Sequence, residues 1–124
     1  MAIRRVHAAA AILFIAAILY QVFLAGTAIA NLGGSSDFTA HIGFGYTGVF
    51  VAWLFLILSA LAARRPRREI GFVLLILLDY VIQTTLPAAK ASTPWVAALH
   101  PVNALVLFGL AAWYARRAWA AATA

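Results

Sequence analysis

Two histidines, His41 and His100, are the residues of this chain whose type and position could do chemistry. Both lie in strongly hydrophobic surroundings, where ionisable side chains are rare and mark functional sites by default. Neutral imidazole is the commonest metal ligand in proteins, and histidine is a standard axial ligand of haem iron. The chain has no cysteine, and its one methionine is Met1. A six-coordinate iron would therefore take these two imidazoles as its ligands, with haem b as the expected cofactor.

Small and aromatic residues close to His41 could shape a slot for a flat group. Gly45 and Gly48 continue the His41 face at i+4 and i+7, and Phe44 offers aromatic surface beside them. Pro101, directly after the second histidine, should bend its helix. Three polar side chains could hydrogen-bond to the ligand imidazoles and so tune the iron: Asp37, Gln21 and Asn103. Asp37, four residues before His41, is the expected acceptor for that ring.

Other interpretations of the same residues stay open. A non-haem metal could use His41, His100 and Asp37. The polar groups could instead only hold helices together in a non-enzymatic accessory or assembly subunit of a larger membrane complex. In a small proton-coupled transporter, Asp79 would carry the proton or cation. His7, near the other end of its helix, is expected to be an interfacial residue without chemistry.

The elements that must position these residues are transmembrane helices. Of the 124 residues, 66% are hydrophobic and 10% are charged, whereas a soluble domain is about half apolar and about a quarter charged. A span of the bilayer needs about 20 apolar residues, so four spans use nearly the whole chain and exclude a soluble catalytic domain. We expect one all-α domain over residues 1–124, an up-and-down transmembrane four-helix bundle. Its spans are predicted at about 6–28, 38–62, 69–86 and 95–115.

Polar and proline-containing segments separate the predicted spans. They are residues 31–37, the Arg64–Arg68 run around Pro66, and residues 87–94, which begin and end with proline. The second and fourth spans run in the same direction, and alternate helices of an up-and-down bundle are usually diagonal partners. His41 and His100, near the starts of these two spans, are therefore predicted to face each other across the core.

Basic residues predict the orientation. Eight of the nine fall on one side of this arrangement, and only Lys90 falls on the other. Cytoplasmic loops carry the Lys/Arg excess, which predicts a multi-pass membrane protein with both termini on the cytoplasmic side. The net charge of +6 is then a topology signal and does not indicate nucleic acid. The expected partners are the lipid bilayer and a membrane redox partner or larger membrane complex.

Three segments carry a resemblance to known families: Gln21-Val-Phe-Leu-Ala-Gly26, His41-Ile-Gly-Phe-Gly45 and Leu99-His-Pro-Val-Asn-Ala104. Together they resemble a bacterial family of four-helix membrane proteins of unknown function, over nearly the whole chain. More distantly, a histidine at the outer end of the second and fourth helices resembles one half of haem A synthase, where such histidines bind haem and a carboxylate precedes the first. The resemblance implies a haem-binding bundle with Asp37 near the place of that carboxylate, one residue further from its histidine. The expected function is electron transfer or haem handling.

Overall fold

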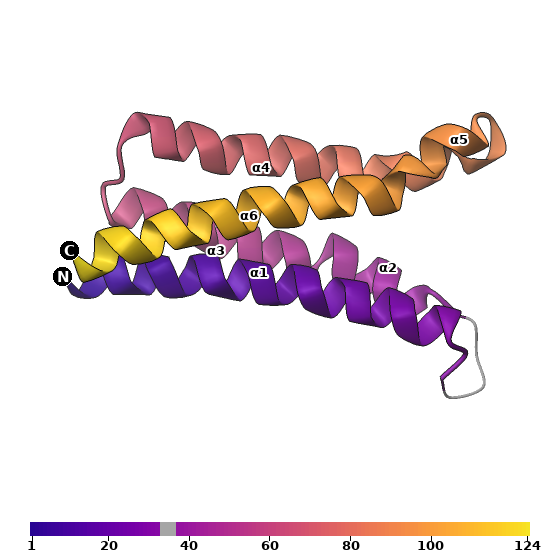
Figure 1. The fold of residues 1–124 in the computed structure, drawn as a ribbon, viewed down its shortest axis with the longest axis horizontal. Coiled ribbons are helices and arrows are strands. Elements are labelled where there is room, and N and C mark those ends of the chain that lie inside the picture. The colour runs from indigo at the N-terminus through magenta and orange to yellow at the C-terminus, as the bar shows by residue number, and fades with distance from the viewer. Residues whose placement is uncertain (33–36) are drawn as a thin grey trace.

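Helices make up most of the part of the chain that the computed structural model describes, residues 1–32 and 37–124 (Figure 1). Within these residues, four helical segments are long and apolar enough to cross a membrane: Ala2–Ile29, Thr39–Ala62, Arg67–Ala91 and Pro94–Thr123. No strand occurs in the described ranges. The predicted all-α four-helix fold is confirmed.

Each span packs against the next along the chain, and the last returns to the first. The elements are α1 (Ala2–Ile29), α2 (Thr39–Tyr46), α3 (Gly48–Ala62), α4 (Arg67–Thr85), η1 (Leu86–Ala91), α5 (Pro94–Ala97) and α6 (Leu99–Thr123). Helix α1 contacts α3, α3 contacts α4, α4 contacts α6, and α6 contacts α1. The second and fourth spans are therefore diagonal partners. Figure 1 shows both termini and the α3–α4 connection at one end, called the basic end below, and α2 and α5 at the other, called the pocket end.

Small residues on α1 let its neighbours approach closely. Ala8, Ala10 and Ala11 are almost completely buried, which is the small-residue packing that membrane helices favour. Phe14 and Leu56 fill the core between α1 and α3 and are no more than 1% exposed. Large apolar side chains cover much of the outside of the bundle, and this outer surface suits contact with lipid.

Both even-numbered spans are interrupted close to their histidines. Between α2 and α3 the helix breaks at Thr47, whose hydroxyl donates to the Gly43 carbonyl at 2.7 Å, a back-bond that bends helices. Between α5 and α6 it breaks at Ala98. Pro101 has no N–H to give to the Ala97 carbonyl, so the second break falls where the sequence predicts a bend.

Two of the predicted boundaries differ from the structure. The third span was expected to stop at Leu86 before Pro87, but the chain continues there as the 3₁₀ helix η1. Proline is tolerated at the start of a helical segment, where its missing N–H has no partner to lose. The fourth span extends past the final arginine pair to Thr123. Of the predicted loop at residues 31–37, positions 33–36 lie outside the described residues.

Candidate cofactor-binding site

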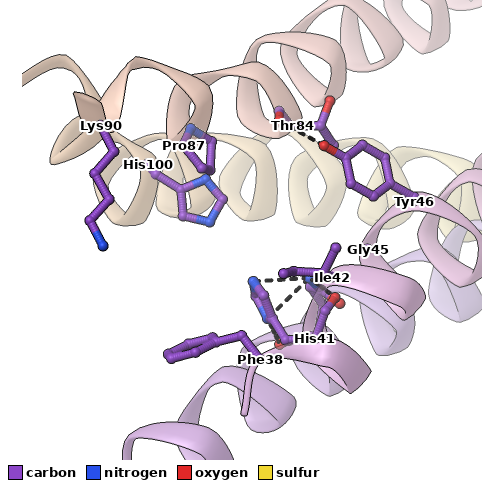
Figure 2. A pocket seen from close by; sticks show the side chains of 10 residues that line it. Phe38, His41, Ile42, Gly45, Tyr46, Thr84, Pro87, Lys90 and His100 are labelled. Carbon is purple, nitrogen blue, oxygen red and sulfur yellow. Dashed lines mark hydrogen bonds between the residues drawn. The ribbon is translucent and has the colours of Figure 1, made fainter. Parts of the chain in front are cut away.

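His41 and His100 face each other at the pocket end, as the diagonal arrangement predicts. Their ring centres are 6.2 Å apart, and the ring planes are nearly perpendicular at 81°. Both rings line a pocket of about 440 Å³, which lies within the size range of small-molecule sites. Figure 2 shows the two rings on opposite sides of the gap, each with a nitrogen turned toward it.

Gln21 of α1 holds the His41 ring. The Nδ1 atom of His41 lies 3.0 Å from the Gln21 main-chain carbonyl. A carbonyl only accepts hydrogen bonds, so Nδ1 donates to it, and Nε2 lies 3.3 Å from the Gln21 amide nitrogen. The Gln21 side-chain amide donates to the His41 carbonyl at 2.8 Å. A Cβ on Gly45 would lie 2.7 Å from this amide, so α1 and α2 can meet here because residue 45 has no side chain.

His100 is held in the same way by Gln83 of α4. Its Nδ1 donates to the Gln83 main-chain carbonyl at 2.9 Å, and its Nε2 lies 3.4 Å from the Gln83 amide nitrogen. The Gln83 amide nitrogen is 3.1 Å from the same Nδ1, and Asn103 donates to Gln83 Oε1 at 3.0 Å. Asn103 therefore supports the residue that supports His100.

The two halves of the bundle thus repeat one arrangement. In each half, a glutamine near the end of the odd-numbered span gives its carbonyl to a histidine of the following span. Sequence reasoning found the histidine in both halves and named Gln21, but it did not connect Gln83 with His100. The similar depth of the two glutamines in their spans is the signal that could have linked them.

The rest of the pocket is mostly apolar. Phe38, Ile42 and Pro87 line it, and at its edge the Tyr46 hydroxyl donates to the Thr84 carbonyl at 3.4 Å (Figure 2). Lys90 of η1 also lines the pocket. Its part in the site was not predicted from the sequence.

Two predicted slot residues lie elsewhere. Phe44 and Gly48 line a separate apolar groove along α1. There the Phe44 ring packs edge-on against the Tyr20 ring, and the two ring centres are 4.8 Å apart. The i+7 argument for Gly48 assumes a continuous helix, and the break at Thr47 turns the following residues away from the His41 face. The Phe44 ring occupies the space that a Gly48 side chain would need.

Asp37 contacts Thr39, and the acceptor role predicted for it at His41 is filled by the Gln21 carbonyl. One Asp37 oxygen accepts hydrogen bonds from the Thr39 main-chain N–H at 2.8 Å and from the Thr39 hydroxyl at 2.6 Å. These two bonds hold the pKa of the Asp37 carboxyl below its usual value. Within residues 1–32 and 37–124, no three His, Cys, Asp or Glu side chains form a group that could hold a metal ion. The non-haem site of His41, His100 and Asp37 is therefore not assembled there.

Asp79 is partly buried one turn before Gln83. The sequence predicts that Asp79 pairs with a polar group such as Gln21 or Asn103, and the Asn103 side chain hydrogen-bonds to the Asp79 carboxyl and donates to its main-chain carbonyl at 3.4 Å. Among the described residues, Asp79 Oδ2 is buried without a hydrogen-bond partner. The side chain therefore lies beside the Gln83 and Asn103 layer rather than in the pocket.

A second polar cluster lies at the basic end, where sequence reasoning expected an inert interfacial histidine. His7 is 1% exposed and bonds to Ser59 Oγ at 3.0 Å through Nδ1 and to the Tyr114 hydroxyl at 2.9 Å through Nε2. The Ser59 hydroxyl donates to the Leu56 carbonyl at 2.8 Å, so its oxygen accepts from Nδ1–H and Tyr114 donates to Nε2. The cluster joins α1, α3 and α6 with its side-chain groups paired.

Comparisons with known proteins place the chain in a family. No curated protein and no solved structure matches it. A family profile described as a family of unknown function, DUF6220, matches residues 21–90, which is more than half of the chain. The matched segment includes Gln21, His41, Gln83 and Lys90, and it ends before His100. The chain therefore belongs to the DUF6220 family.

Proposed function

We propose that this chain binds one b-type haem between His41 and His100 and serves in electron transfer or haem handling within a membrane. One observation carries the proposal. Two imidazoles from diagonal helices, each with Nδ1 fixed on a main-chain carbonyl, face each other across a mostly apolar pocket.

The spacing of the two rings fits one iron between them. An imidazole nitrogen binds a metal at about 2.0–2.1 Å, and the ring centre lies about 1.1 Å further out, so two rings on one iron have centres about 6.3 Å apart. The distance in the structure is 6.2 Å. This separation of the ring centres supports a single iron between the two histidines.

The hydrogen bonds of the rings also fit metal ligands. A histidine that binds a metal almost always donates its other N–H to a carbonyl, carboxylate or water, which fixes the tautomer and the ring orientation. Gln21 and Gln83 provide main-chain carbonyls for this purpose. With Nδ1 of each ring on a carbonyl, Nε2 is the atom that would bind the iron.

A bound haem would supply one-electron chemistry, and the protein would hold it and exclude water. If His41 and His100 both bound the iron, they would leave it no open position for a small molecule. This arrangement favours electron transfer or temporary haem carriage. The apolar walls contributed by Phe38, Ile42 and Pro87 would cover the macrocycle.

We further propose that the basic end lies in the cytoplasm of a bacterial cell and that the pocket opens on the opposite side of the inner membrane. The support is the position of eight of the nine basic residues near the termini and the α3–α4 connection (Figure 1). Short loops rich in Lys and Arg stay on the cytoplasmic side. A haem in this pocket would therefore lie close to the outer face.

Titration of the purified, haem-free protein with haem tests the proposal. We expect saturation at one haem per chain, with the spectrum of a low-spin iron. Single His41→Ala and His100→Ala variants should give a high-spin spectrum or lose haem, because each removes one axial ligand. His7→Gln is the matched control, since it changes the third histidine at the basic end and should leave the low-spin spectrum intact.

Two results would contradict the proposal. A wild-type protein that folds but binds no haem would favour the accessory-subunit interpretation, in which the Gln–His hydrogen bonds only join helices. Saturable low-spin binding that persists in the His41→Ala, His100→Ala double variant would show that other residues hold the haem.

A further inference from the structure

Lys90 stands apart from the other basic residues of the chain. The remaining eight lie toward the basic end, while Lys90 lies in η1 at the pocket end. The positive-inside rule does not favour a lysine on this side, which points to a local role. Its side chain is exposed and lines the pocket, and Figure 2 shows it on the same side of His100 as the Phe38 ring, away from Tyr46.

Among the described residues that line the pocket, none carries a carboxylate, and the walls other than Lys90 are imidazole, amide, hydroxyl and apolar groups. Of the three acids of the chain, Glu69 and Asp79 lie on α4 and do not line the pocket. The third acid, Asp37, lies at the pocket end next to Phe38, where it accepts two hydrogen bonds from Thr39, and it does not line the pocket either. An exposed positive charge at the edge of an apolar pocket suits a ligand that is apolar in its body and anionic at its edge.

We propose that Lys90 binds a carboxylate at the edge of the ligand held between His41 and His100, so that this edge faces the pocket opening. The inference rests on the proposed function, and under it the carboxylate is a haem propionate. The apolar walls would contact the macrocycle, and the ammonium group would bind the negatively charged carboxylate. Lys90 is therefore a positioning residue, which selects one orientation of the ligand over its inverse.

The chemistry of the partners supports this pairing. An ammonium group is a compact cation with three donors, and it binds a carboxylate through charge-assisted hydrogen bonds. Its flexible stem can lie along apolar surface while the charged end reaches water. The same lysine also lies in the last turn of η1, where a cation stabilises a helical segment. That structural role would not depend on the charge of the ligand, so ligand charge separates the two roles.

The experiment compares two probes, haem b and its dimethyl ester, in which the propionates are neutral. Both are titrated into the detergent-solubilised wild type and into three variants, Lys90→Arg, Lys90→Gln and Lys90→Glu. Because an exposed ion pair contributes little, Lys90→Gln should weaken haem b binding by up to about fivefold and charge reversal by about tenfold. Lys90→Arg should retain wild-type affinity, and dimethyl ester binding should change less than about twofold in every variant.

Ser92→Glu is the control, because it adds a negative charge to the same segment at a position that does not line the pocket. Its effect on haem b binding should be well below that of Lys90→Glu. Equal losses for both probes would overturn the inference, since they would show that Lys90 only supports the fold. Unchanged haem b binding in Lys90→Glu would overturn it as well, while the proposed function would stand. If the wild type bound no haem, the proposed function would fail first and this inference with it.

Discussion

Replacing Tyr114 with phenylalanine removes one hydroxyl from the cluster at the basic end. That hydroxyl donates to His7 Nε2 at 2.9 Å, and both residues are only 1% exposed. The aromatic ring keeps its stacking on Phe72, whose centre is 5.8 Å away. The substitution therefore removes this bond, and the hydrogen bond of the same hydroxyl with Arg65, with little change in packing; a His7 variant separates the two.

The expected loss of stability follows from His7 Nε2, which loses its hydrogen-bond donor in the variant. A buried acceptor left without its donor costs about 1–3 kcal/mol, and measured side-chain hydrogen bonds between membrane helices average about 0.6 kcal/mol with a maximum of about 1.7. Since water cannot reach His7 Nε2, we expect the free energy of unfolding to fall by about 1–2 kcal/mol in Tyr114→Phe. In a His7→Leu background the same change should cost at least about 1 kcal/mol less, because the acceptor is already gone.

Reversible unfolding with sodium dodecyl sulfate in mixed micelles, followed by circular dichroism, measures these differences. Tyr20→Phe is the matched control, because Tyr20 is 48% exposed and its change should stay within about 0.5 kcal/mol. If Tyr114→Phe were as stable as the control, or if its effect were unchanged in the His7→Leu background, the assignment of this hydrogen bond would be refuted.

Three further predictions follow from named contacts. Gly45→Ala should lower stability by about 1 kcal/mol, because the new Cβ displaces the Gln21 amide from the His41 carbonyl, and Gln21→Ala should remove most of that effect in the double variant. Asp79→Asn should raise the free energy of unfolding and leave haem binding unchanged, because a carboxylate with an unpaired buried oxygen is costly in hydrocarbon; loss of a measured proton flux with haem binding intact would instead support transport. A cysteine at position 92 should react with an impermeant reagent added outside intact cells and one at position 66 should not, and the reverse pattern would overturn the proposed orientation.

Sequence reasoning reached the fold because hydropathy and helix direction determine it. Four apolar segments separated by polar turns predict the bundle, and the shared direction of the second and fourth spans brings His41 near His100. These properties depend on averages over many residues, which a single sequence records well.

Several details of the site could not be predicted from the sequence, because they depend on main-chain atoms and on neighbouring helices. The groups that fix the two imidazoles are main-chain carbonyls, which every residue has, so no residue type marks them. The break at Thr47 moves Gly48 off the His41 face. Burial of His7 arises from Ser59 and Tyr114 on two other spans, and its position along α1 alone does not reveal them.

Electron paramagnetic resonance of the ferric, haem-loaded protein tests the central claim most directly, because it reports both the number and the orientation of axial imidazoles. With ring planes at 81°, we expect a single low-spin species with the strong anisotropy of perpendicular imidazoles. In His41→Ala and in His100→Ala this signal should be replaced by a high-spin signal. A high-spin wild type, or a low-spin signal that survives in the double variant, would contradict the assignment of these two residues as the ligands.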